Sequence, residues 1–437
     1  MAPVRQDSPH RPGPIPTAAA PGAPALPPAQ GVGQKARPTS TARPIGDGFD
    51  PSKARNLISR PSDTFKAFKA APGPKRAYAS LATDQRARYD QLLGAAQADP
   101  INKAKAVKQV QSLLGPDGGF KHYDLVDKAL QGQTGDRAGA PAALRQLLFN
   151  GRLTQGGKGP LQQNALEHLG LLAAQQRTPT GLDSHALAAD VVLDLAHPNR
   201  IKQGTGNQDC GGTAAAVIAA KGRPAEYARI VTELGTKGTT RVGNELWTAS
   251  KPKGGVDERS QSQRLFAATY VEQTNDPTIA PTTDAQMKGL LNGEYGSEMA
   301  KGLRSLTGRN YQAAFIPTAQ ESNLVAHGAA VAEGLTALAQ HLEKGAPIAL
   351  NVDHHWVVAT GATGPQGQKL IHVADGSGHD DTISVRDLRN RIQGFVFDDA
   401  ISSVPMDMRR RRYDKPGIGG DGAEGTQPIG SRSRNNN

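Results

Sequence analysis

The chain has 437 residues, of which 37% are hydrophobic and 4% aromatic, and its formal net charge is +11. This length is enough for two or three domains. The single cysteine excludes an internal disulfide and a cysteine-rich zinc site. Residues 1–75 carry +7 and residues 406–437 carry +3, which leaves +1 for the interior. The charge distribution therefore does not predict a folded groove for specific nucleic-acid binding.

The first 50 residues predict a disordered, proline-rich leader. They hold 11 prolines among Ala, Gly and Ser, and they show no apolar period. They also lack the apolar core of a secretory signal, and the longest apolar run, residues 214–220, is too short to span a bilayer. We expect no transmembrane segment, synthesis in the cytoplasm, and any export to proceed without a cleaved signal.

Residues 51–198 predict a helical domain. Apolar residues recur at helical spacing in four segments, which are 83–97, 142–149, 161–176 and 183–196. The last of these ends before Pro198, where a helix is expected to stop.

From residue 199 the pattern changes to that of a mixed α+β domain over residues 199–405. "NQDCGGTAAAVIAAKG" predicts a turn followed by a helix, and "VAEGLTALAQHLEKG" predicts a helix with Leu335, Leu338 and Leu342 on one face. Three pieces rich in β-branched residues then predict strands, "APIALNV", "HHWVVATG" and "KLIHVADG". The pattern leaves the order of elements in 225–330 open, and residues 406–437 predict a disordered basic tail.

Cys210 is the first candidate for chemistry. It opens a predicted helix, where exposed N–H groups favour the thiolate, although the neighbouring Asp209 opposes this. Gly211 and Gly212 would leave the thiol approachable. The competing interpretation is a structural cysteine in an apolar helix.

His355 and Asp375 form the second candidate. If the strands on either side of Pro365 pair symmetrically, residue i faces residue 730 − i, and His355 faces Asp375. Direct cross-strand partners share a face, so a carboxylate there would orient an imidazole. His354 is expected to point to the opposite face, and Trp356 is expected to pack.

A metal site is the alternative for the histidines in this region. His355, His372, His379, Asp380 and Asp381 are close in sequence, but none of their spacings is that of ligands on a helix face. We therefore expect no metal and no cofactor.

Together, "DCG" at a helix start, "GAPIALNVDHHWVVATG" and "LIHVADG" resemble the papain-like cysteine peptidases, nearest the bacterial branch of double-glycine leader peptidases. The resemblance covers residues 199–400. It implies that a helix bearing Cys210 packs on an antiparallel sheet, that Cys210 is the nucleophile, and that His355 is the general base and acid. It also implies that Asp375 orients His355. The family places an oxyanion-hole glutamine six residues before the cysteine, whereas Gln203 is seven before it and Gln208 two before it. Gln203 is the better candidate.

These features predict a cysteine hydrolase that acts on a protein or peptide amide, with a bacterial toxin or injected effector as the setting. A glutamine deamidase or a transglutaminase-like acyltransferase would use the same residues, and a non-catalytic adaptor would use none of them. The sequence leaves the oligomeric state open.

Overall fold

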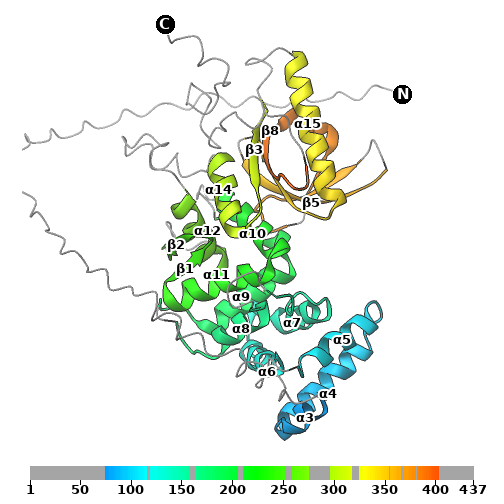
Figure 1. Cartoon of the computed structure of the whole chain (residues 1–437), viewed down its shortest axis with the longest axis vertical. Coiled ribbons are helices and arrows are strands. Elements are labelled where there is room, and N and C mark those ends of the chain that lie inside the picture. The colour runs from blue at the N-terminus through cyan, green and yellow to red at the C-terminus, as the bar shows by residue number, and fades with distance from the viewer. Residues whose placement is uncertain are drawn as a thin grey trace, which may run out of the picture. The chain divides into compact units, whose positions relative to one another are not determined.

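A computed structural model gives the structure of this protein (Figure 1). The described residues are 74–115, 119–156, 163–178, 180–204, 210–250, 258–274, 296–316, 324–353, 355–365, 369–379 and 381–402. They all belong to one compact unit, residues 69–437. The predicted leader and the predicted basic tail lie outside them.

The described chain begins with helices, as predicted for this part of the sequence. They are α3 (Pro74–Ser80), α4 (Thr83–Gln97), α5 (Lys103–Ser112), α6 (Gly119–Leu130), α7 (Ala140–Phe149), α8 (Ala165–Ala173) and α9 (Ser184–Ala196), with short turns η1 (Gly135–Arg137) and η2 (Pro198–Arg200). Side-chain caps fix two of the starts: Asp183 accepts from the Ala186 N–H at 2.9 Å before α9, and Asn164 accepts from the Glu167 N–H at 3.0 Å before α8.

The next part combines helices with a hairpin. Its elements are α10 (Cys210–Gly222), α11 (Pro224–Lys237), β1 (Thr239–Val242), β2 (Glu245–Thr248), α12 (Gln261–Thr274) and α14 (Gly296–Thr307). Contacts of α8 with α11 and of α9 with α12 cross residue 198, so the helices before and after this position pack together. The domain division at this position stays a prediction.

An antiparallel sheet follows. Its strands are β3 (Tyr311–Phe315), β4 (Ile348–Val352), β5 (His355–Thr363), β6 (Leu370–Ala374), β7 (Asp381–Ser384) and β8 (Ile392–Asp398), and the helices between them are α15 (Leu324–Glu343) and α16 (Val385–Arg391). The strand order is β3-β8-β4-β5-β6-β7. The predicted helix with Leu335, Leu338 and Leu342 and the three predicted strands are confirmed as α15, β4, β5 and β6.

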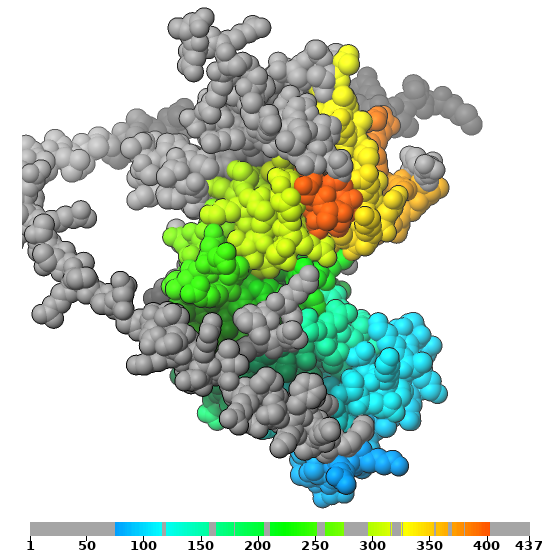
Figure 2. Space-filling view, viewed as in Figure 1, coloured from blue at the N-terminus to red at the C-terminus, as the bar shows by residue number. Residues whose placement is uncertain are grey.

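Each face of the sheet belongs to a different hydrophobic core. Ala349, Trp356 and Val358 share a core with α10 and the other helices, whereas Leu350 and Val357 share a core with α15. Successive residues of a strand point to opposite faces, so this division follows from the alternation along β4 and β5. Figure 2 shows the end of β8, in orange, between the lime surface of residues 296–316 and the yellow surface of α15. The α+β class is therefore confirmed, with helices on both faces of the sheet.

Among the helices of the described residues, none has both the length and the apolar character needed to cross a membrane.

Candidate functional site

Cys210 is the first residue of α10, at the helix start that the sequence predicted. Its side chain is 4% exposed and belongs to the same core as Trp356 and Val358 of β5. The helix also contacts α11, α12 and α14. Burial in apolar surroundings disfavours a thiolate, whereas the N–H groups at a helix start favour it. The two environments act in opposite directions on the reactivity of this thiol.

A contact at the far end of α10 fixes its position along β5. Lys221 Nζ donates to the Thr360 carbonyl oxygen at 2.8 Å. Cys210 lies eleven residues before Lys221, a helical rise of about 16 Å, and His355 lies five residues before Thr360, a strand rise of about 16 Å. Lys202 and Gln203, which lie between η2 and α10, bond Ser377 and Gly376 directly after β6, so the chain approaches α10 from the end of the sheet where β5 starts. Cys210 and His355 thus lie at the same end of the α10–β5 pair.

The imidazole of His355 is held by the backbone of the neighbouring strand. Its Nε2 lies 2.7 Å from the carbonyl oxygen of Asp375, directly after β6. A carbonyl oxygen can only accept, so Nε2 carries the hydrogen and the neutral ring presents Nδ1 as its basic nitrogen. The contact therefore selects the tautomer that a base acting through Nδ1 requires.

The predicted register of this hairpin is wrong by two residues. Val358 pairs with Ala374 and Ala359 with Val373, so residue i faces residue 732 − i, and the register shifts again between Ala359 and Gly361. The prediction assumed a loop symmetric about Pro365, whereas the pairs next to the loop, such as Thr363 with Leu370, already sum to 733, so the hairpin is centred beyond Pro365. The Asp375 carboxylate accepts from the Ser377 N–H at 2.8 Å, and it is the Asp375 carbonyl that bonds the imidazole.

The alternation along β5 separates His355 from its neighbour Trp356. Trp356 is buried on the face that packs against α10, so the prediction that it packs is confirmed. His355 is in phase with Val357, which faces α15, and it is half-buried at the first position of the strand. Its ring reaches the end of β6 from there. His354 lies outside the described residues.

Gln203 lies beside the same strand end. Its backbone N–H donates to the Gly376 carbonyl at 2.7 Å, and Lys202 forms a bridge with Ser377. Gly376 has φ +84, and a Cβ there would lie 2.8 Å from Gln203 Cβ, so a glycine is needed for this close approach. The structure thus brings Gln203, Asp375 and His355 together through consecutive contacts. Gln208 lies outside the described residues.

A buried carboxylate supports the segment that carries Gln203. Asp194 of α9 accepts from Tyr227 Oη at 2.8 Å, from Gln263 Nε2 at 2.7 Å and from the Ser262 hydroxyl. Burial raises the pKa of Asp194 to about 7, against the effect of these donors. Gln263 in turn accepts from the Lys202 N–H at 3.3 Å. This hydrogen-bonded chain connects α9, α11 and α12 to the strand end at Gly376.

Gly212 has a packing role that the sequence analysis missed. A Cβ at Gly212 would lie 2.7 Å from the Ala267 carbonyl oxygen and 3.0 Å from Ala267 Cα, both on α12. Gly212 therefore allows α10 to pack closely on α12, and the expectation that it leaves the thiol approachable stays a prediction. A glycine two residues after a helix start was the available signal, and close helix packing is its ordinary explanation.

The metal alternative gains no support from the described residues, in which no group of three or more His, Cys, Asp or Glu side chains is arranged to hold a metal ion. His372 Nε2 is hydrogen-bonded to Thr363 Oγ1 at 3.1 Å. Asp380 lies outside the described residues.

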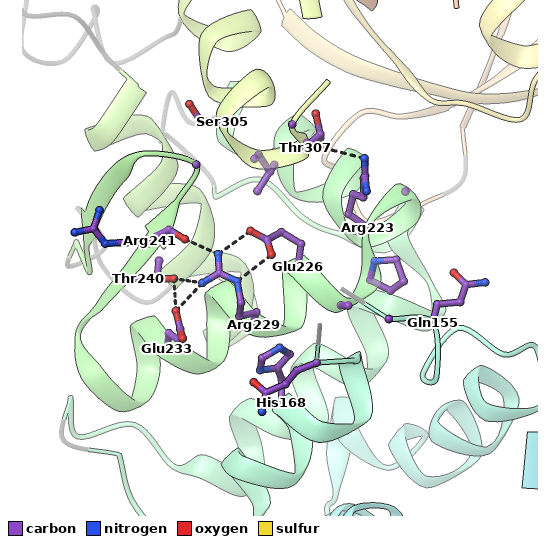
Figure 3. Close-up of a pocket in the computed structure, with 18 of the residues that line it drawn as sticks. Gln155, His168, Arg223, Glu226, Arg229, Glu233, Thr240, Arg241, Ser305 and Thr307 are labelled. Carbon is purple, nitrogen blue, oxygen red and sulfur yellow. Dashed lines mark hydrogen bonds and ion pairs between the residues drawn. The ribbon is translucent and has the colours of Figure 1, made fainter. Parts of the chain in front are cut away.

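The sequence analysis also missed a cavity of about 710 Å³. It is lined by α11, the β1–β2 hairpin, the end of α14 and His168 of α8 (Figure 3). Its lining includes Gly222, the last residue of α10, so it lies at the opposite end of that helix from Cys210. The cavity is formed by segments that are far apart in the sequence, so no local motif could predict it.

No family model matches the sequence, and no curated protein is significantly similar to it. The resemblance to papain-like peptidases therefore rests on the motif residues themselves.

Proposed function

We propose that the protein is a papain-like cysteine hydrolase that cleaves a protein or peptide amide through a thioester on Cys210. The observation that carries the proposal is the contact between His355 Nε2 and the Asp375 carbonyl, at the end of β5 where α10 also starts. It leaves Nδ1 as the basic nitrogen, which is the arrangement that a nucleophile–base–orienter set needs.

The residues would act in two steps. Cys210 Sγ attacks the amide carbon while its proton passes to His355 Nδ1, and the imidazolium then protonates the leaving amine. Water attacks the resulting thioester with His355 as base, which releases the acid and restores the thiol. The Asp375 carbonyl holds the ring in place, and Gln203 is the candidate donor to the oxyanion together with the Cys210 N–H.

The test begins with the thiol itself. An activated Cys210 reacts with a small alkylating agent near pH 7 much faster than an ordinary thiol of pKa about 8.5, and intact mass spectrometry measures the rate. The Cys210→Ala variant controls for other sites and serves as a trap to capture substrate. Alkylation no faster in the native than in the urea-unfolded protein would reject an activated thiol.

Gln203→Ala provides a test of acyl transfer. Loss of one oxyanion donor lowers kcat by about 10²–10³. Alkylation of Cys210 should stay near its normal rate, because alkyl transfer develops no oxyanion. Gln208→Ala is the matched control and should have a small effect.

The product distinguishes the related reactions. A cut in the substrate identifies a peptidase, conversion of glutamine to glutamate identifies a deamidase, and a covalent adduct identifies a transferase. The burial of Cys210 favours one further candidate, a non-catalytic adaptor whose cysteine is structural. If the protein is an adaptor, Cys210 should be alkylated slowly. Any captured partner should then bind equally to the wild type and to Cys210→Ala and should not be chemically changed by either.

A further inference from the structure

The cavity at the end of α11 has the size of a small-molecule site. Its volume of about 710 Å³ falls in the range of ligand pockets, roughly 300–1,000 Å³. Four cationic side chains and two carboxylates line it, with apolar surface from residues such as Pro224 and Leu306. It lies apart from Cys210, and what it binds does not depend on the proposed function.

One guanidinium in the cavity wall is fully engaged by the protein. Arg229 donates to both Glu226 oxygens at 2.6 and 2.9 Å, to Glu233 at 2.7 Å, to Thr240 Oγ1 at 3.0 Å and to the Arg241 carbonyl at 2.5 Å. These bonds use all five of its N–H groups. Arg229 therefore attaches the hairpin to α11. Lys237 also pairs with Glu233, at 3.1 Å, so Arg229 and Lys237 together balance the charges of the two carboxylates and leave Arg223 and Arg241 to face a ligand.

Arg223 is the cation with donors to spare. Its Nη2 donates to the Thr307 carbonyl at 2.9 Å, and its Nε and Nη1 meet no acceptor among the described residues. Burial lowers the pKa of Arg223, and the nearby cation Arg309 lowers it further. A bound anion would relieve both effects.

His168 supplies a second unused polar group. Its side chain is 4% exposed and lines the cavity, yet its ring nitrogens have no hydrogen-bond partner among the described residues. Burial lowers the pKa of His168 to about 4, so the ring is neutral at pH 7 and offers one donor and one acceptor. Figure 3 shows His168 below and Arg223 above the Glu226–Arg229 pair.

We propose that this cavity binds a small organic oxyanion, with its carboxylate or phosphate group on Arg223 and a hydroxyl or carbonyl group on His168. The excess of cations over carboxylates in the lining favours an anion over a neutral or cationic ligand. The apolar wall favours an organic molecule over a bare inorganic ion.

The test is isothermal titration calorimetry of the full chain at pH 7 and constant ionic strength. Four probes share one carbon skeleton, namely glycerol, glycerate, glycerol 3-phosphate and 3-phosphoglycerate. We expect saturable binding of at least one of the three anions and none of glycerol, and the comparison of glycerate with glycerol 3-phosphate identifies the preferred group. Absence of binding by all three anions would overturn the proposal.

Two variants place the ligand. Arg223→Gln and His168→Leu should each weaken binding about tenfold or more, because each removes a partner of the ligand. Arg386→Gln, an exposed arginine on α16, is the matched control and should bind as the wild type does. Unchanged binding in Arg223→Gln and His168→Leu would reject the cavity as the site. If either variant is unstable, a shift of the His168 ring signals in NMR spectra of the wild type on adding 3-phosphoglycerate decides the question, and an unmoved signal overturns the proposal.

Discussion

The position of an imidazole at the start of β5 determines which of two adjacent histidines can serve Cys210. We expect His355→Ala to slow turnover by roughly 10²–10⁴-fold, because general acid–base catalysis contributes a rate factor of that size. Alkylation of Cys210 should also become slower. His354→Ala should do much less, because the ring of His355 is the one held at the end of β6 by the Asp375 carbonyl. The alkylation rate measured by intact mass is the readout.

The opposite outcome would also be informative. His355 is in phase with Val357, on the face away from α10, whereas Trp356 faces α10. If His354→Ala is the damaging change, His354 is the base, and His355 has a structural role at the end of β6.

A second residue-scale prediction concerns His341, which is fully buried in α15. The Asp398 N–H donates to its Nε2 at 3.2 Å, and its Nδ1 lies 3.3 Å from the Pro347 carbonyl, so the ring is bound in its neutral form. Burial lowers the pKa of His341 to about 4, from about 6.5 when unfolded. Because the unfolded chain takes up the proton first, stability should fall as the pH drops from 6.5 towards 4.

Urea unfolding at pH 7 and pH 5 measures this effect. The linkage predicts a loss of about 2 kcal/mol from His341 between these two values. His341→Asn should be less stable at pH 7 but should lose less on acidification, which separates this histidine from His168, whose pKa is shifted in the same direction. An equal pH dependence in both proteins would contradict the assignment.

At the scale of elements, α12 is held between two helices that approach it through glycines. Gly212 of α10 meets Ala267, and Gly302 of α14 meets Tyr270 and Thr274, all on α12. Gly212→Ala should destabilise the protein by about 1–3 kcal/mol, because the backbone carbonyl of Ala267 cannot move aside as a side chain would.

Gly222→Ala in the same helix is the control. A Cβ there meets nothing within 4 Å, so the substitution should be neutral or stabilising by up to about 1 kcal/mol. Denaturant midpoints of the two variants test the contrast, and equal midpoints would show that α10 and α12 can separate without cost.

The elements that local pattern determines were predicted well. Alternating β-branched residues indicated β4, β5 and β6, and the spacing of Leu335, Leu338 and Leu342 indicated α15. The register of β5 against β6 was not predictable, because it depends on the centre of the hairpin, which lies beyond Pro365, and on a shift between Ala359 and Gly361, and no sequence pattern shows either. The support of Gln203 by Asp194 was also hidden, since it requires contacts between residues far apart in the chain.

At the scale of the whole molecule, β8 joins parts of the sheet that are otherwise separate. It lies between β3 and β4, and Phe395 and Phe397 are buried against α15 while Val396 is buried on the other face. A chain that ends at residue 391 should therefore lose protection in β3 and β4, whereas a chain that ends at residue 402 retains every described element. Hydrogen exchange measured by mass spectrometry compares the two, and native-like protection in the shorter chain would contradict this role.

The same strand order affects how the protein folds during synthesis. The α4–α14 part emerges from the ribosome first, and its contacts are largely made among its own helices. β3 and β4 emerge next, and the strand position between them in the sheet stays unoccupied until β8 has been translated. Unpaired strand edges promote aggregation, so this interval is when the nascent chain most needs a chaperone. Slow translation between residues 316 and 392 would prolong that exposure, and it would lower the soluble yield without changing the finished protein.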